Sequence, residues 1–206
     1  MKFLLSVLVL SLLAGPACAQ VTDLFISEYI EGSVYNKALE IYNGTDDSIN
    51  LGNYSLELYA NGSTVPTTIT LGNADLNPLD VFVIANPSAS VAILGHTDLT
   101  SSALNFNGND ALVLRRDSYV IDRLGQVGLD PGASWNCASG STLNSTLRRQ
   151  AGVCSGDPNL FDQFNPCTEY DFYPSDTFDD LGRHSNDCWS VGSRETSWGS
   201  LKANFK

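Results

Sequence analysis

The chain has 206 residues, which is enough for one hydrophobic core and excludes a large multidomain protein. Apolar residues make up 43% and charged residues 17%, a composition that excludes a wholly disordered chain. The 11 basic and 23 acidic side chains give a net charge of −12 at pH 7, which disfavours general electrostatic binding of DNA or RNA. Only a local basic patch or a bridging cation would overcome this repulsion.

The first segment is typical of a secretory signal peptide. Lys2 precedes an apolar run over residues 3–14, and Ala17-Cys18-Ala19 precedes Gln20. The run is shorter than the roughly 20 apolar residues that a membrane-spanning helix needs. We therefore predict cleavage after Ala19, no membrane span, and a secreted or extracellular location, with the periplasm as the alternative. A lipoprotein processed at Cys18 is less favoured because no aliphatic residue precedes that cysteine at the usual distance.

From Leu24 onward, short apolar stretches separated by Asn, Gly, Asp and Ser predict a series of strands. The first begins at Leu24, and the others are predicted at 38–42, 54–59, 69–71, 81–85, 111–114, 119–121 and 145–149. The first three alternate apolar with polar residues, so each is expected to have one buried and one solvated face. Residues 115–118 are expected to form a hairpin turn. A helical pattern is weakly present only at 88–94.

Seven or more short strands at this spacing predict an all-β protein, an immunoglobulin-like antiparallel β-sandwich, with a closed barrel as the alternative. The segment from about residue 152 to 206 differs in composition, since it is richer in Asp, Asn, Pro and aromatic residues. We expect it to be an irregular C-terminal tail that disulfides pin onto the sandwich.

Four cysteines remain after signal-peptide cleavage: Cys137, Cys154, Cys167 and Cys188. An even number of cysteines in an exported chain indicates two disulfides, with three connectivities open. We expect neighbours to pair, Cys137 with Cys154 and Cys167 with Cys188. Zinc is the rival use, but the chain has no Cys-x-x-Cys pair, and His96 and His184 lie far apart in sequence.

Catalytic motifs are scarce. The sequence has no Gly-x-Ser-x-Gly, no His-Glu-x-x-His and no phosphate-binding glycine-rich loop. His96 and His184 stand outside any motif, and we expect a surface or loop role for each. The residues therefore disfavour an enzyme.

Acidic residues form two groups in the sequence. One surrounds the first two strands and the other lies in the tail: Glu28, Glu31 and Glu40, with Lys37 nearby, and Asp171, Asp176, Asp179 and Asp180. Such clusters could bind calcium, although neither follows the usual calcium-loop spacing. A carboxyl pair could also serve glycoside hydrolysis, but nothing in the sequence marks which two would meet. The preferred interpretation is solvated charges and turn-forming Asp side chains.

Five arginines carry half of the positive charge of the cleaved chain: Arg115, Arg116, Arg123, Arg148 and Arg149. A patch of them could contact phosphate or carboxylate groups, but salt bridges to the excess of acidic side chains are the preferred prediction. Five tyrosines could likewise form a sugar-binding platform, with cross-strand packing as the preferred role. They are Tyr29, Tyr35, Tyr42, Tyr54 and Tyr59.

Three stretches resemble the lamin tail domain in its bacterial, exported form. They are residues 26–32 (ISEYIEG), 36–43 (NKALEIYN) and 51–59 (LGNYSLELY), and residues 107–114, 121–125, 146–149 and 176–184 resemble later parts of exported members. The resemblance covers about residues 21–184. It implies an immunoglobulin-like sandwich without intrinsic catalysis, with 36–43 as a fold signature. Exported relatives often carry a nuclease or phosphoesterase domain beside it, and in nuclear lamins the domain binds protein and DNA.

We accordingly predict a signal peptide at 1–19, a lamin-tail-like domain at 20–184 and a tail at 185–206. The 23 residues from His184 to Lys206 are too few for a catalytic domain, so the nuclease activity of fused relatives is not carried over. No catalytic, cofactor-binding or metal residue is assigned. The expected function is a secreted non-catalytic binding module for a protein, a surface polymer or nucleic acid. The alternatives are a small calcium-dependent extracellular hydrolase or nuclease, a nuclease-accessory protein, or a structural coat component.

Overall fold

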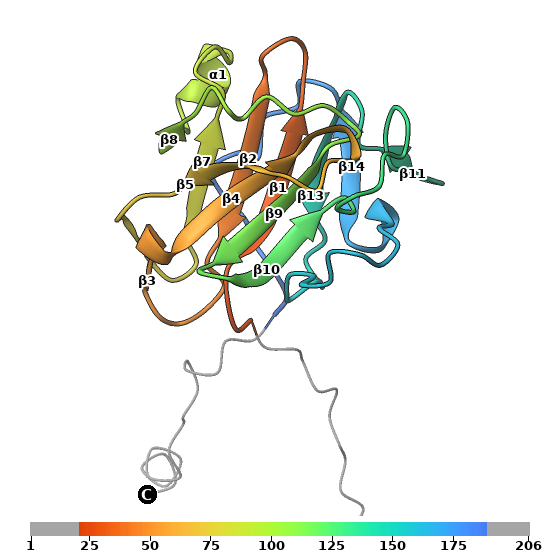
Figure 1. Cartoon of the computed structure of the whole chain (residues 1–206). Helices are drawn as coiled ribbons and strands as arrows, with labels where there is room; N and C mark the ends of the chain where they lie inside the picture. Colours follow the sequence, from red (N-terminus) through yellow and green to blue (C-terminus); the bar gives the residue numbers. More distant parts are fainter. Residues whose placement is uncertain (1–20, 189–206) are drawn as a thin grey trace, which may run out of the picture.

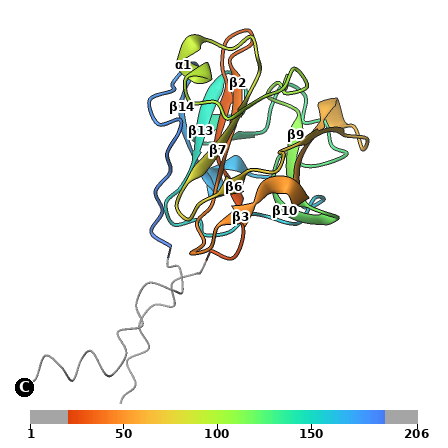
Figure 2. The same cartoon turned by 90° about the vertical axis from the view of Figure 1, so that its left-hand side faces the viewer.

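Two β-sheets pack face to face in the computed structural model, which describes residues 21–188 (Figure 1 and, turned by 90°, Figure 2). The strand order is β14-β13-β1-β2-β7-β8 in the larger sheet and β10-β9-β4-β5 in the smaller. Neighbouring strands run antiparallel except for the parallel pair β7 and β8. The predicted immunoglobulin-like sandwich is confirmed. The predicted signal peptide, 1–19, lies outside the described residues.

The six-stranded sheet gathers strands from both ends of the described chain. Its members in spatial order are β14 (Tyr170–Pro174), β13 (Ser145–Arg149), β1 (Phe25–Glu31), β2 (Lys37–Tyr42), β7 (Val81–Ala85) and β8 (Leu99–Thr100). The C-terminal segment is largely irregular and is pinned by two disulfides, as predicted, but it also contributes β14, which pairs with β13 over five residue pairs. The C-terminal segment is therefore part of the sandwich and not only attached to it.

The four-stranded sheet consists of β10 (Tyr119–Leu124), β9 (Ala111–Arg116), β4 (Tyr54–Tyr59) and β5 (Thr67–Thr70). Two short pairs form separate two-stranded sheets: β3 (Ile49–Asn50) with β6 (Asp75–Leu76), and β11 (Asn136–Cys137) with β12 (Gly140–Ser141). The helical elements are one turn each: α1 (Val91–Leu94) and the 3-10 turns η1 (Leu51–Asn53), η2 (Ala60–Gly62) and η3 (Pro166–Thr168).

The hairpin from β9 to β10 is tighter than the sequence suggested. Arg115 and Arg116 belong to β9, and only Asp117 and Ser118 form the turn. Asp117 has a φ of 53°, a left-handed conformation that Asp tolerates better than most residues. The strand pattern therefore continues through two charged residues, which the sequence had placed in the turn.

The main core lies between the two sheets. It contains alternate residues of the central strands, such as Leu39 and Ile41 from β2 and Leu56 and Leu58 from β4, all buried. These alternating positions point to the same face of a strand, so each sheet contributes one apolar face.

The outer face of the six-stranded sheet departs from the predicted alternation. Every residue of β1 and β2 is buried, including the polar ones. α1 and the segment after β14 cover this face, where Ile93 and Leu181 pack with Ile30, Ala38 and Val83. β4 keeps the expected pattern, with buried residues alternating with half-buried ones along most of its length. The expected solvated face was therefore wrong for β1 and β2, because a second layer of chain lies over them.

Candidate functional site

The two acidic groups of the sequence meet on the outer face of the six-stranded sheet. Glu28 on β1 lies directly opposite Glu40 on β2, and both side chains are buried. The segment from Asp176 to His184, here called the strap, crosses this position. The Gly182 N–H donates to Glu40 Oε2 at 2.7 Å, which ties the strap to the sheet.

Arg148 on β13 links the sheet to the strap. Its Nε donates to Glu28 Oε1 at 3.1 Å, and its Nη2 donates to Asp179 Oδ1 at 2.6 Å. Its guanidinium also lies 4.2 Å from the centroid of the Tyr173 ring on β14. Arg148 thus pairs with a carboxylate from each of the two acidic groups, Glu28 from the strands and Asp179 from the strap.

Burial changes the protonation of this carboxyl pair. It raises the pKa of Glu28 to about 7, although the hydrogen bond from Arg148 acts in the opposite direction. Burial also raises the pKa of Glu40 to about 8, against hydrogen bonds from Ser27 and Gly182. Glu28 Oε2 is buried and has no hydrogen-bond partner among the described residues. Both groups therefore hold protons through a large part of the neutral range.

Glycoside hydrolysis needs two carboxyl groups that face each other, and Glu28 and Glu40 are a pair that meets in this way. Glu28 is 2% exposed and Glu40 is fully buried, so a sugar chain has no route to them beneath the strap. No sequence motif could have paired them, since only the register of β1 and β2 places them opposite each other. Their surroundings favour a structural role.

The remaining acidic candidates also hold the fold together. Glu31 pairs with Lys37 at 2.8 Å, and Asp176 accepts hydrogen bonds from the β1–β2 loop. Within residues 21–188, no group of three or more His, Cys, Asp and Glu side chains is arranged to hold a metal ion. The calcium alternative therefore gains no support from the described part of the chain.

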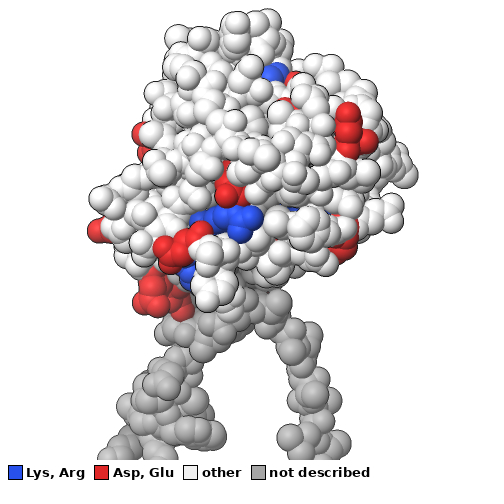
Figure 3. Space-filling view, viewed as in Figure 1, with Lys and Arg blue, Asp and Glu red and all other residues white. Residues whose placement is uncertain are grey.

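The predicted salt bridges of the arginines are present. Every Lys and Arg within residues 21–188 is ion-paired: Lys37, Arg115, Arg116, Arg123, Arg148, Arg149 and Arg183. In Figure 3, blue basic atoms adjoin red acidic ones and form no broad basic surface on the face shown. Arg149 is fully buried against Asp122, so Arg148 and Arg149 do not form a surface patch. A phosphate-binding role for these arginines has no geometric support.

The cysteines form two disulfides, as predicted, but with a different connectivity. Cys137 is bonded to Cys167, and Cys154 to Cys188. The expected pairing of neighbouring cysteines is wrong. β14 returns antiparallel along β13, and with this path of the chain Cys167 meets Cys137 while Cys188 meets Cys154. The Asp187 N–H donates to the Ala151 carbonyl at 2.8 Å and aligns the end of the chain segment with Cys154.

The histidines and tyrosines are mostly structural. His96 is exposed in a loop, whereas the His184 ring packs 4.8 Å from the Tyr42 ring and 5.7 Å from Phe25. Burial lowers the pKa of His184 to about 4. Tyr29, Tyr42, Tyr54 and Tyr59 are buried, in agreement with the preferred packing role. Tyr35 is the exception, with half of its surface exposed.

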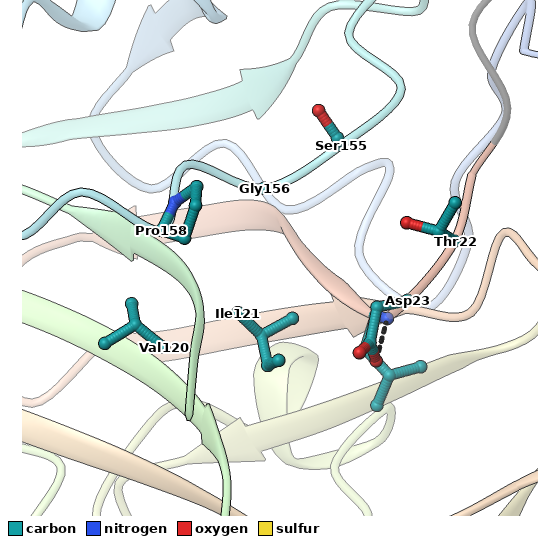
Figure 4. Close-up of a pocket in the computed structure, with 8 residues that line it drawn as sticks. Thr22, Asp23, Val120, Ile121, Ser155, Gly156 and Pro158 are labelled. Carbon is teal, nitrogen blue, oxygen red and sulfur yellow. Dashed lines mark hydrogen bonds between the residues drawn. The ribbon is translucent and has the colours of Figure 1, made fainter. Parts of the chain in front are cut away.

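A pocket of about 370 Å³ lies beside β10 (Figure 4). Val120, Ile121 and Pro158 line it on one side, with Thr22 and Asp23 on the other. Asp23 is already engaged, because it accepts a hydrogen bond from the Tyr54 hydroxyl at 2.6 Å and pairs with Arg116. The pocket thus offers no free charged group for catalysis.

The β1–β2 loop presents a different surface at the end of the molecule that carries α1 (Figures 1 and 2). Val34 and Tyr35 project from this loop, with 79% and 50% of their surface exposed, and Val91 at the start of α1 is 87% exposed. The Ser90 N–H donates to Asn36 Oδ1 at 2.8 Å, which joins the start of α1 to the loop. We call Val34, Tyr35 and Val91 the loop tip.

The loop tip is held in a strained conformation. Val34 has a φ of 52°, a region that β-branched residues rarely adopt. Asp176 of the strap fixes the loop by accepting hydrogen bonds from the Ser33 N–H and Asn36 Nδ2, each at 2.9 Å. The sequence predicted neither the strain nor the exposure, because both depend on the contact between Asp176 and a loop 140 positions earlier.

The segment 36–43 behaves as a fold signature. Asn36 joins the loop to the strap and to α1, while Glu40 accepts hydrogen bonds from the Ser27 hydroxyl and the Gly182 N–H. Asn43 Nδ2 donates to the backbone carbonyls of Asp47 at 2.8 Å and of Leu76, at the end of β6, at 2.9 Å. The polar side chains of segment 36–43 form hydrogen bonds within the protein, so their presence in the sequence indicates the fold and not a reaction.

Comparison with known families gives one match, to the Lamin Tail Domain, over residues 18–128. Searches of curated proteins and of solved structures found no match. The matched range ends just after β10, so β13, β14 and the strap lie beyond it. Within residues 21–188, no helix has the length and apolar character needed to cross a membrane. The match spans more than half of the chain, and the chain belongs to the lamin tail domain family.

Proposed function

We propose that this chain is exported and acts outside the cell as a non-catalytic module that binds a protein partner through the loop tip. The observation that carries this proposal is the exposure of Val34 and Tyr35 on a strained, braced loop, together with that of Val91 at the start of α1, which is hydrogen-bonded to the loop through Ser90. Backbone strain of this kind persists only where surrounding contacts impose it, and it is common at binding sites.

The composition around the loop tip favours a protein surface as the partner. Residues 32–36 and 86–95 contain no charged side chain, although the chain carries a net charge of −12. The end of the molecule that bears α1 is largely white in Figure 3. Cores of protein interfaces are depleted in charged residues and enriched in aromatic ones such as Tyr35.

The bracing of the loop also favours binding. Asp176 and Asn36 hold the backbone before a partner arrives, so association orders little additional chain. Nucleic acid is a poorer candidate for the described part of the chain, because its basic side chains are all ion-paired. Export is supported by the signal-peptide pattern and by the two disulfides.

The test compares two charge-introducing variants of the cleaved protein. Val34→Asp with Val91→Asp alters the loop tip, and Val65→Asp with Phe161→Asp is the matched control, since Val65 is 77% and Phe161 68% exposed elsewhere. Each protein is immobilised and probed with proteins of the culture medium, a glycan array and a nucleic-acid array.

We expect the wild type and the control to retain the same protein, and the loop-tip variant to bind it at least tenfold more weakly. Equal retention by the loop-tip variant would rule out this surface. Binding only to a glycan or a nucleic acid would replace the protein partner with that ligand class.

A further inference from the structure

The strap is attached to the sandwich at both ends. It follows β14, which ends at Pro174, and it leads to Cys188, which is bonded to Cys154. Its two turns fall at Asp176 and Gly182, which have φ values of 63° and 95°. The strap lies between these two fixed points and contains no paired strand, so it can leave the sheet while the strands remain paired.

Polar contacts and a small apolar cluster hold the strap against the sheet. The Thr146 hydroxyl donates to Thr177 O at 2.9 Å, and Arg148 and Glu40 bind the strap as described above. Phe178 and Leu181 pack on the sheet with Ile30 and Ala85. This apolar cluster is much smaller than the main core, so the polar contacts decide a larger share of the strap's stability.

The charges at this contact are unbalanced. Glu28 and Glu40 on the sheet face Asp179 and Asp180 on the strap, with coulombic repulsion from the other carboxylates acting on both glutamates. Two guanidinium groups face these four carboxyl groups. Arg148 pairs with Glu28 and Asp179, and Arg183 pairs with Asp180 at 2.7 Å.

The other polar groups at the contact do not restore the balance. Tyr173 on β14 lies beneath Arg148, and the exposed His96 ring lies against Gly182. His184 is neutral above about pH 4, because burial lowers its pKa. Lys37 is committed to Glu31. The contact is therefore close to neutral only while Glu28 and Glu40 are protonated.

We propose that the strap is a pH-sensitive latch, which is closed while Glu28 and Glu40 are protonated and is released when both ionise. An ionised carboxylate that is buried beside other carboxylates lacks hydration, and release of the strap restores water to it. The disulfide between Cys154 and Cys188 keeps the released strap on the molecule.

Release of the latch also acts on the loop tip. Asp176 lies at the start of the strap and fixes Ser33 and Asn36, so its departure removes the brace from Val34. Loss of the brace lets the loop relax and weakens a pre-organised binding surface. This consequence rests on the proposed function, whereas the latch itself does not.

Amide hydrogen exchange of the cleaved, disulfide-intact protein tests the latch without any partner. Protection factors, corrected for the intrinsic pH dependence of exchange, are compared at pH 6 and pH 9. We expect protection of residues 176–184 to fall on the order of a hundredfold to a thousandfold, since the ionisation of Glu28 and Glu40 above pH 6 changes the opening equilibrium by roughly one and two factors of ten. β4 and β9 should keep their protection.

Two variants separate the latch from other effects of pH. Glu28→Gln with Glu40→Gln should keep the strap protected at pH 9, while Glu57→Gln, at the pair with Arg115 on the other sheet, should behave like the wild type. An unchanged wild-type strap at pH 9, an equal fall in the double variant, or simultaneous loss of protection in β4 and β9 would each overturn the latch. Loss of binding in the loop-tip variant with an unchanged strap would leave the proposed function standing alone.

Discussion

The outer faces of the two sheets each carry an arginine beside a glutamate, in opposite surroundings. Arg115 pairs with Glu57 across β9 and β4, and both side chains keep contact with water. Arg148 pairs with Glu28 across β13 and β1, where the strap lies over them and Glu28 is buried. Arg148 thus lies directly opposite Glu28 in a covered cluster, whereas Arg115 lies diagonally across from Glu57 in a pair that still contacts water.

Burial by the strap changes what the same residue types do. On the open sheet, Arg115 and Glu57 keep 19% and 14% of their side-chain surface in contact with water, so the pair adds less to stability than a fully buried one. On the covered sheet, removing water raises the pKa of Glu28 and makes the state of the strap depend on protonation. Variants of the two sheets should therefore differ in the size of their effects and in their response to pH.

The largest effect is expected from the fully buried ion pair that joins the two sheets, Arg149 on β13 with Asp122 on β10. Arg149 donates to Asp122 Oδ2 at 2.7 Å and to Ile26 O at 2.7 Å, with no exposure. Arg149→Ala leaves Asp122 buried without its partner and should lower the free energy of unfolding by about 3–5 kcal/mol. Urea denaturation measures this loss; a change below about 1 kcal/mol, typical of an exposed pair, would contradict the contrast between a fully buried ion pair and one that contacts water.

Removing the disulfide at the end of the strap should have the next largest effect. Cys154→Ser with Cys188→Ser opens a loop of 34 residues and should cost roughly 2–4 kcal/mol. Thermal unfolding with and without a reductant measures the change. The double variant should be insensitive to reduction at this bond, and retention of wild-type stability would show that the strap is held without its tether.

The pH dependence of stability should come from the covered side. The folded-state pKa values of Glu28 and Glu40, about 7 and 8, lie above the ordinary value of 4.5, so the folded state binds more protons between these limits. Their contribution to stability is complete below about pH 4.5 and is lost as the pH rises through 8. Chemical denaturation from pH 6.5 to 9 should show a loss on the order of 2 kcal/mol.

Glu40→Gln provides the comparison for that pH profile. It should flatten the profile above pH 6.5, while Glu57→Gln on the open sheet should leave it unchanged. His184 acts in the opposite direction and at lower pH, since its pKa falls from 6.5 to about 4 and its contribution is lost as the pH drops through that range. If the wild type, Glu40→Gln and Glu57→Gln give parallel profiles of stability against pH, the titrating groups lie elsewhere.

Relief of strain at the loop tip should give a smaller effect of opposite sign. Val34→Gly removes the cost of a β-branched residue at a φ of 52° and should raise the free energy of unfolding by about 1 kcal/mol. Val65→Gly, at an exposed position without such a φ, should not stabilise the protein. Equal shifts in the thermal midpoints of both variants would argue against strain at Val34.

The smallest effect is expected on the open sheet. Arg115→Ala removes the pair with Glu57 and should change stability by about 1 kcal/mol or less, because water can reach the Glu57 carboxylate that remains. The effect should shrink further at high salt. A loss as large as that of Arg149→Ala would remove the distinction between the two sheets.

Several features were determined by the sequence alone. Alternation of apolar and polar residues located β4, and the compact apolar run located β7, with the bounds that the structure shows. The even cysteine count indicated two disulfides, and the excess of acidic side chains indicated that the arginines would be ion-paired. The segment 36–43 pointed to the family. These are local or compositional properties, so neighbouring residues and simple counts suffice to reveal them.

The tertiary structure alone decided which distant segments meet. The disulfide connectivity followed from the return of β14 along β13, and the pairing of Glu28 with Glu40 followed from strand register. The strap then converted the expected solvated face of β1 and β2 into a buried one and fixed a strained loop through Asp176. Sequence alternation reports which face of a strand is polar, but burial depends on whether another part of the chain covers that face, and only long-range packing determines this.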